Sequence, residues 1–231
     1  MRGVTAIVLA GLVTAGAVLA TLVIVRPWGA APSVEQGARL LAQGDDEAAI
    51  RLLLPAVAAA PSDAWGHYYL GLAYARVGVG RGALTQLAEA VRLAPGEAGF
   101  QDGLGRAYRD AGDASRARAA FEEAIRRDPA EPRYRVDLAG LLLDEGRVPE
   151  AMAALRRAVE LAPRSASLRL VLARTLGRAG DRDEMLRQYR AAARLAPTLD
   201  QDAALAELAR EELRAAAPVA VSGGSAPPTA R

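Results

Sequence analysis

Apolar and small residues recur at fixed places along residues 30–199, and the whole arrangement repeats every 34 residues. Numbered from position 1 to 34, the units are 30–63, 64–97, 98–131, 132–165 and 166–199. In each unit, positions 7, 8 and 11 share one stripe of a first helix. Positions 20, 24 and 27 share one stripe of a second helix, because an α-helix completes a turn in about 3.6 residues. The pattern predicts five helix-turn-helix units.

Two residues that interrupt helices mark each period. A glycine at position 15 can adopt the left-handed conformation that closes the first helix, and a proline at position 32 ends the second. The glycines are Gly44, Gly78, Gly112, Gly146 and Gly180, and the prolines are Pro61, Pro95, Pro129, Pro163 and Pro197. Units of this length with two helices each are typical of solenoids, in which every unit packs on its neighbours.

Residue size at the packing positions carries a family resemblance. In the second unit, small Gly71 and Ala83 at positions 8 and 20 leave room for the two backbones, and Leu87 at position 24 fills the space beside them. This arrangement resembles the tetratricopeptide repeat, which has small residues at 8, 20 and 27, a large residue at 24 and proline at 32. The resemblance implies an all-α fold, a right-handed α-solenoid of five repeats. The family's tryptophan at position 4 is replaced by Ser33, His67, Gln101, Arg135 and Arg169.

Residues 4–25, which follow an N-terminal tail of residues 1–3, form an uncharged run with twelve Val, Ile or Leu residues. As a helix the run is roughly 33 Å long, enough to cross a hydrocarbon core of roughly 30 Å. We therefore expect a transmembrane helix that acts as a signal anchor. The alternative is a cleaved signal peptide, although apolar runs in those are usually only about 7–15 residues long.

The charges beside this run predict its orientation. Arg2 and the amino terminus precede it and Arg26 follows it, which favours a cytoplasmic amino terminus. The repeats would then face the periplasm from a bacterial inner membrane. Residues 26–33 are expected to be a linker that overlaps the start of the first unit.

Two further segments follow the last unit. Residues 200–217 alternate leucines with charged residues in the manner of an amphipathic helix, so we expect them to cap the open end of the last repeat. Residues 218–231 are rich in Gly, Ser and Pro, which predicts a disordered tail.

Charge argues against a nucleic-acid partner. All 29 basic residues are arginines, and all but Arg2 and Arg26 lie in residues 27–231 together with all 27 acidic residues. The part after the apolar run is therefore neutral, whereas nucleic-acid binders usually carry a basic excess.

The residue types also argue against an enzyme. The chain has no cysteine and one histidine, His67, which falls at a packing position of the second unit. We find no nucleophile with a matching base. We expect no catalysis, no cofactor and no metal site.

A second stripe of the first helices predicts a binding groove. Positions 2, 5, 9 and 12 are spaced 3, 4 and 3, so they share a face distinct from the packing stripe. The resemblance implies that this face, with position 13, lines a concave groove for peptides or partner helices. The predicted groove residues are Trp65, Tyr68, Leu72, Arg76, Asp102, Arg106, Arg109, Arg133, Val136, Leu170, Arg174 and Arg178.

The groove composition suggests the chemistry of its ligand. Trp, Tyr and Arg are the side chains most often found as binding hot spots. We expect an apolar anchor to contact Trp65, Tyr68 and Leu72 while acidic groups meet Arg106, Arg109 and Arg174. The alternative is that these arginines pair with local acids, namely Asp102, Asp110, Asp137 and Asp144, and only solvate the solenoid.

These expectations together describe a membrane-anchored, non-enzymatic scaffold that binds a protein or peptide. Similar anchored repeat proteins in bacteria assist the assembly of envelope complexes, including cytochrome c maturation, secretion and pilus biogenesis. The alternative is a structural protein that forms a homo-oligomer, with its groove occupied by a neighbouring copy.

Overall fold

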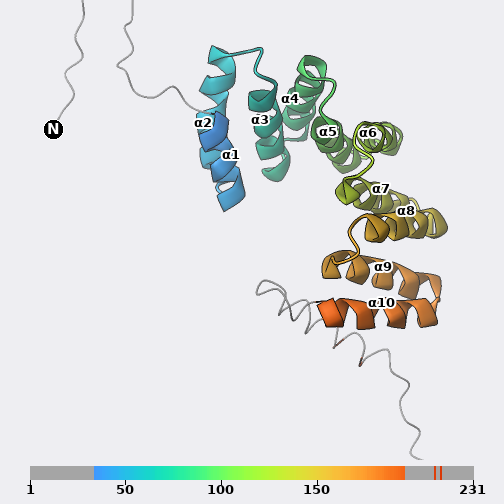
Figure 1. Cartoon of the computed structure of the whole chain (residues 1–231). Coiled ribbons are helices and arrows are strands. Elements are labelled where there is room, and N and C mark those ends of the chain that lie inside the picture. Colours follow the sequence, from blue (N-terminus) through green and yellow to red (C-terminus); the bar gives the residue numbers. More distant parts are fainter. Residues whose placement is uncertain (1–33, 196–210, 212–213, 215–231) are drawn as a thin grey trace, which may run out of the picture.

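A computed structural model describes residues 34–195 together with residues 211 and 214. This part of the chain is all-helical, as predicted, with ten helices (Figure 1). The helices are α1 (Val34–Gln43), α2 (Asp46–Ala59), α3 (Ala64–Arg76), α4 (Gly80–Leu93), α5 (Ala98–Asp110), α6 (Ala114–Arg127), α7 (Pro132–Asp144), α8 (Val148–Leu161), α9 (Ala166–Ala179) and α10 (Arg182–Leu195). Helices α3, α5, α7 and α9 begin at the first residues of the second to fifth units.

Local sequence signals fix the helix ends. Asp63 precedes α3 and Asp113 precedes α6, and each side chain accepts a hydrogen bond from a backbone N–H of the first turn. The glycine at position 15 of all five units has a positive φ between 74° and 82°. This confirms the predicted left-handed glycines, which turn the chain between the two helices of each unit.

Glycine at position 8 lets the two helices of a unit approach closely. A Cβ atom on Gly71 would lie 2.6 Å from Leu87 Cγ, and one on Gly105 would lie 2.7 Å from Phe121 Cε1. Leu87 and Phe121 are both fully buried. The predicted match between a small residue at position 8 and a large one at position 24 is therefore confirmed.

Polar side chains at position 4 link successive units. In three units this side chain hydrogen-bonds the carbonyl oxygen of the proline that follows the preceding helix. The pairs are His67 Nε2 with Pro61 at 3.0 Å, Arg135 Nη1 with Pro129 at 2.7 Å, and Arg169 Nη2 with Pro163 at 2.8 Å. At position 4, where the family has tryptophan, these three units thus have a polar side chain that forms a hydrogen bond to the preceding unit.

The helix pairs stack along a curved row, with α3 and α5 inside the bend and α4 and α6 outside it (Figure 1). Each of α1, α3 and α5 contacts the next odd-numbered helix as well as its own partner. Helices α1, α3, α5 and α7 therefore form a continuous inner layer, and α9 is the first helix of the following unit. We call the surface of this layer, made by positions 2, 5, 9 and 12, the inner face.

Several predicted segments lie outside the described residues: the span at 4–25, the linker at 26–33, the tail at 218–231 and, apart from Glu211 and Arg214, the capping helix at 200–217. Pro197 lies outside them too. Among the residues that are described, no helix combines the length and the apolar character needed to cross a membrane.

Candidate binding groove

The predicted groove residues lie at two depths of the inner face. Tyr68, Asp102 and Leu170, all at position 5, are buried, and Val136 at the same position is half-buried. Position 5 therefore forms the floor between neighbouring odd-numbered helices. Positions 2, 9 and 12 supply most of the side chains that reach solvent.

An aromatic cluster holds Trp65 at the N-terminal part of the inner face. The Trp65 ring meets Phe100 edge-on at 4.8 Å and Tyr68 edge-on at 5.8 Å, and Tyr68 stacks on Phe100 at 4.7 Å. Tyr69 lies 5.7 Å from Trp65. Contacts of this kind stabilise aromatic pairs beyond the burial of their area. Trp65 nevertheless keeps 45% of its surface exposed, so a fixed aromatic ring faces solvent.

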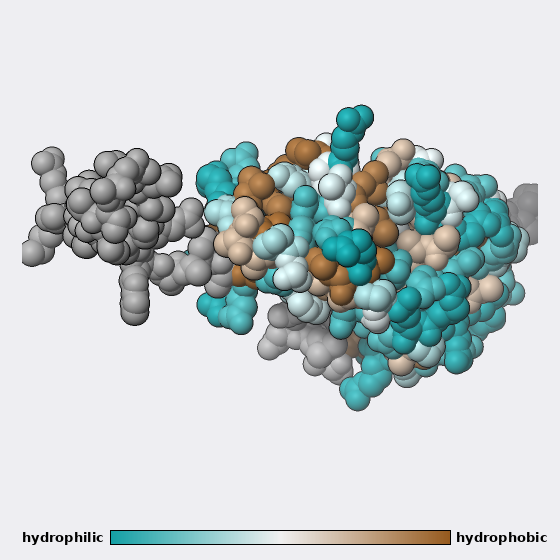
Figure 2. Space-filling model, turned by 90° about the horizontal axis from the view of Figure 1, so that it is seen from above, coloured by the Kyte–Doolittle hydropathy of each residue, from teal (hydrophilic) through white to brown (hydrophobic). Residues whose placement is uncertain are grey.

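An open pocket of about 900 Å³ adjoins this ring. Its apolar walls come from α1, from the end of α2 and the residue after it, and from α3: Val34, Ala38, Ala56, Ala59, Ala60, Trp65 and Tyr69. Glu35, Arg39 and Asp63 supply the polar part of the lining. Viewed from above, hydrophobic residues gather towards the α1–α4 side of the molecule, and hydrophilic residues dominate the opposite side (Figure 2).

A buried carboxylate lies at the centre of the inner face. Asp102 on α5 is fully buried, and neither of its carboxylate oxygens has a hydrogen-bond partner in the described part of the chain. Arg133 on α7 approaches it, with Nη2 3.4 Å from Oδ2. The Arg133 side chain is 48% exposed and its Cζ atom lies 5.4 Å from the centre of the Tyr134 ring. One face of the guanidinium is thus held while the rest meets solvent.

Burial, together with the negative charge of Asp137 on α7, raises the pKa of Asp102 to about 7, against the opposing effect of Arg133 and Arg106. Burial also raises the pKa of the neighbouring Tyr68 phenol, which therefore stays neutral near pH 7. Asp102 therefore changes its charge in the physiological range.

Arg106 and Arg109 carry the positive charge of α5. In the part of the chain that the structure describes, neither forms a salt bridge. Arg109 extends over α7, because its Nη1 atom would lie 3.0 Å from a Cβ placed on Gly140. Asp102, one of the acids named in the solvation alternative, forms an ion pair with Arg133. The charge of Arg106 acts on Asp102 without a direct salt bridge, and Arg109 forms no salt bridge among the described residues.

Other predicted groove residues have structural contacts. Arg76 donates from Nη1 to the Leu41 carbonyl oxygen at 2.6 Å and to Asp46 at 3.1 Å, so it joins α3 to the first unit. Leu72 packs partly buried among the core residues of the first units. Leu170 belongs to the core between α9 and α10. Arg174 and Arg178 are exposed on α9.

Some residues of the surface were missed by the stripe of positions 2, 5, 9 and 12. Phe100 and Tyr134 occupy position 3, and Tyr69 and Asp137 occupy position 6. Both positions flank the stripe on the same helix. The signal was present in the sequence, because Tyr68 and Tyr69 follow Trp65 at spacings of three and four, which place all three on one side of a helix.

His67 has a structural role. Its Nδ1 atom lies 2.7 Å from the side-chain amide oxygen of Gln86, and its Nε2 atom is bonded to Pro61. Both ring nitrogens are therefore engaged. The residues that the structure describes hold no cluster of three or more His, Asp or Glu side chains placed to bind a metal ion.

Comparison with known proteins agrees with this architecture. Residues 103–166 match the family model described as Tetratricopeptide repeat. No curated protein matches the chain.

Several solved structures share this fold. A thermophilic TPR protein of Thermus thermophilus is 26% identical, with a TM-score of 0.64 over 80% of this chain and 96% of that chain. A MamA fragment from Desulfovibrio magneticus RS-1 is 20% identical, with a TM-score of 0.62 over 74% and 98%. YrrB, described as a TPR protein with an unusual peptide-binding site, is 19% identical, with a TM-score of 0.56 over 77% and 90%.

Proposed function

Because this chain is built of tetratricopeptide repeats, we propose that it is a binding scaffold whose inner face holds an extended or helical segment of a partner protein. One observation carries the proposal. The exposed ring of Trp65 lies on the same helix layer as Arg106 and Arg109, which have no salt bridge among the described residues. An apolar anchor point and positive charge that is not held in a salt bridge thus share one surface.

The two parts of this surface fit a ligand with two kinds of side chain. An apolar residue of the partner would enter the pocket beside Trp65 and Tyr69, where it loses contact with water. Acidic residues further along the segment would meet Arg106 and Arg109. Hydrogen bonds between guanidinium and carboxylate are charge-assisted and can be bidentate, so they also fix the orientation of the segment.

The similar structures are compatible with this role. YrrB is described as having a peptide-binding site, and it shares the helix arrangement of this chain at 19% identity. At that level the likeness extends to the fold alone. The proposal for this chain therefore rests on its own inner face.

The location of the scaffold forms part of the same proposal. The uncharged residues 4–25 would anchor the chain in a bacterial inner membrane, and the repeats would face the periplasm. There the scaffold would serve the assembly of an envelope complex, as in cytochrome c maturation, secretion or pilus biogenesis. A reporter enzyme that is active only outside the cytoplasm, fused after Arg231, should be active. An inactive fusion at normal expression would reverse the proposed orientation.

The binding surface is tested by crosslinking and affinity capture of the full-length chain from native membranes. A Trp65→Ala, Arg106→Ala, Arg109→Ala triple variant should lose the partner that the wild type captures, because it removes the apolar anchor and the charges that are not held in salt bridges. Circular dichroism would verify that the variant stays folded.

A matched variant of the even-numbered helices, Arg92→Ala, Arg126→Ala, Arg157→Ala, should capture the partner as the wild type does. If both triple variants recover the same proteins as the wild type, the inner face is not the binding surface. If the captured partner is a second copy of the chain, the protein is a self-associating structural element.

A further inference from the structure

The centre of the inner face holds two acids and two arginines from neighbouring helices. Helix α5 supplies Asp102 and Arg106, and α7 supplies Asp137 and Arg133. Asp102 is fully enclosed, and both its carboxylate oxygens lack a hydrogen-bond partner in the described residues. A buried ionised carboxylate without hydrogen bonds is strongly disfavoured. The group is thus placed where any change in nearby charge alters its protonation.

Apart from Asp128, whose charge acts on Tyr134, the other described elements around Asp102 present uncharged groups. From α3 the facing group is the Tyr68 phenol, and α7 adds Tyr134. Helices α4 and α6 present Leu87 and Phe121 to this stretch of α5, where the glycines bring them close. The charge balance at this point of the inner face is therefore set by the two acids and the two arginines.

We propose that Arg133 and Arg106 form a carboxylate-binding site that takes up one proton with its ligand, and that buried Asp102, beside Asp137, receives this proton. The proposal rests on the proposed function, since the ligand carboxylate belongs to an acidic segment bound along the inner face. The affinity of the inner face for that acidic segment should therefore rise as the pH falls.

The physical basis is a competition for Arg133. When both acids are ionised, two negative charges balance the two guanidinium groups, and Arg133 is attracted towards Asp102. A proton from solvent on Asp102 leaves a net positive charge and weakens the attraction between Asp102 and Arg133. The exposed part of the guanidinium can then bind a ligand carboxylate. By linkage, a bound carboxylate favours protonation of Asp102 to the same extent.

The test uses fluorescein-labelled hexaglutamate as the probe and hexaglutamine as its uncharged control. Binding to the full-length chain in a nonionic detergent is followed by fluorescence anisotropy at low salt between pH 8 and pH 6. Glutamate side chains, with an ordinary pKa of about 4.3, are ionised throughout this range. For a group that titrates near pH 7, the affinity for hexaglutamate should rise about five- to ninefold from pH 8 to pH 6.

Two variants locate the proton. Asp102→Asn should bind hexaglutamate at pH 8 as the wild type does at pH 6, with little further change. Asp137→Asn removes the negative charge that raises the pKa of Asp102, so the rise in affinity should move to lower pH. Asp144→Asn, the same substitution at the exposed end of α7, should keep the wild-type pH dependence and serves as the matched control.

The outcomes separate this inference from the proposed function. If hexaglutamate binds at neither pH, both the proton uptake and the acidic ligand are wrong. If it binds with the same affinity at both pH values, or if Asp102→Asn keeps the wild-type pH dependence, only the proton uptake is overturned. Should Asp102→Asn fail to fold, Asp137→Asn decides, because an unshifted pH dependence in that variant contradicts the proposal.

Discussion

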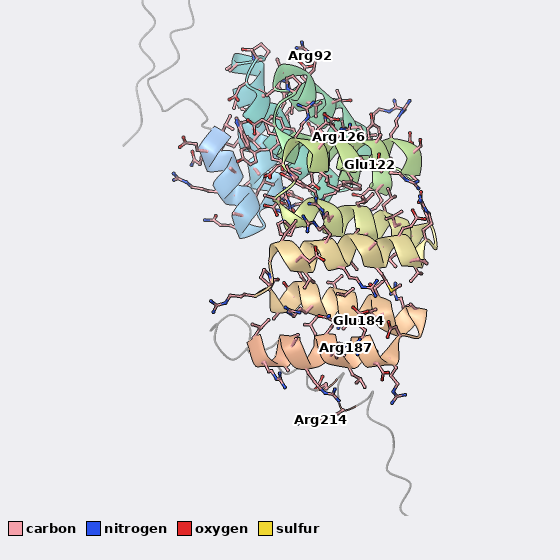
Figure 3. The ribbon with its side chains drawn as sticks, turned by 45° about the vertical axis from the view of Figure 1, so that its right-hand side comes forward. Arg92, Glu122, Arg126, Glu184, Arg187 and Arg214 are labelled. Carbon is pink, nitrogen blue, oxygen red and sulfur yellow. The ribbon has the colours of Figure 1, made fainter. Side chains whose placement is uncertain are left out.

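Arginines on the even-numbered helices form salt bridges, whereas two arginines of the inner face do not. On α4, α6 and α8, arginines pair with a glutamate three residues away on their own helix. The pairs are Arg92 with Glu89, Arg126 with Glu123, and Arg157 with Glu160. Figure 3 labels Arg92 on α4, Arg126 and Glu122 on α6, and Glu184 and Arg187 on α10. On the inner face, Arg106 and Arg109 have no such partner among the described residues.

The difference shows which charges are already used by the fold. A pair within one turn of a helix is formed by local sequence and is exposed, so it contributes little to stability. Other pairs of the even-numbered layer join units, as Arg118 does with Glu145 and Arg156 with Glu184. The arginines of α5 do neither, and Arg133 meets a carboxylate that burial disfavours. Charge that neither stabilises a helix nor joins two units is available to a ligand.

The largest expected effect breaks the contact between the two layers themselves. Gly71→Leu places a side chain where a Cβ alone would lie 2.6 Å from Leu87 Cγ and 3.1 Å from the Leu87 backbone nitrogen. Overpacking of this kind should destabilise the fold by about 3 kcal/mol, measured by chemical denaturation followed by circular dichroism.

Gly99→Ala is the control for this substitution. Position 99 has only the Tyr134 hydroxyl at 4.0 Å from a built Cβ, and alanine favours the helix, so stability should rise by about 0.5–1 kcal/mol. If Gly71→Leu unfolds like the wild type, α3 and α4 do not pack through this glycine.

The next effect concerns Asp102 and depends on pH. Its pKa of about 7 in the folded chain lies above the ordinary value of 3.8, so the folded state binds more protons than the unfolded state between these values. Wild-type stability should therefore fall as the pH rises through this window, with the full loss present above pH 7. Asp102→Asn removes this loss, so it should stabilise the fold more at pH 8 than at pH 5, by about 2–3 kcal/mol.

Glu123, an acid of the even-numbered helices, should make stability depend on pH in the opposite direction. Hydrogen bonding to Arg126 lowers the pKa of Glu123, so its contribution to stability is present above its unfolded pKa and is lost as the pH falls. Glu123→Gln should therefore destabilise slightly at pH 8. Denaturation curves of both variants at pH 5 and pH 8 check the contrast, and Asp102→Asn without a pH-dependent gain would contradict the raised pKa of Asp102.

The sequence predicted the fold well because the fold depends on local signals. The glycine at position 15 and the size of the residues at positions 8 and 24 act within one unit, and each unit repeats them. The placement of Trp65, Arg106 and Arg109 followed from the same register. The role of Arg76 did not follow from the register. Arg76 donates a hydrogen bond to the Leu41 carbonyl oxygen in the preceding unit, and the periodic pattern does not predict a hydrogen bond between residues so far apart in sequence.

The sequence contained a signal for the special role of Asp102 that the prediction of the groove did not take into account. Position 5 is Tyr68, Val136 and Leu170 in the neighbouring units, so an acid there replaces an apolar residue. Its burial and its proximity to Arg133 and Asp137 depend on how α5 and α7 approach each other. That approach is a property of the packed solenoid and cannot be derived from the pattern of one unit.

The smallest expected effect compares two arginines that are adjacent in sequence on α8. Arg157 pairs with Glu160 on the same helix, and the two side chains are 59% and 61% exposed. Arg157→Ala should change the stability by less than about 0.5 kcal/mol, because solvent screens such a pair. Arg156 reaches Glu184 on α10 through two hydrogen bonds at 3.2 and 2.5 Å, so Arg156→Ala should destabilise by more, about 1 kcal/mol. Equal effects of the two substitutions would mean that pairs between units contribute no more than pairs within a helix, and the distinction between charges used by the fold and charges left for a ligand would lose its basis.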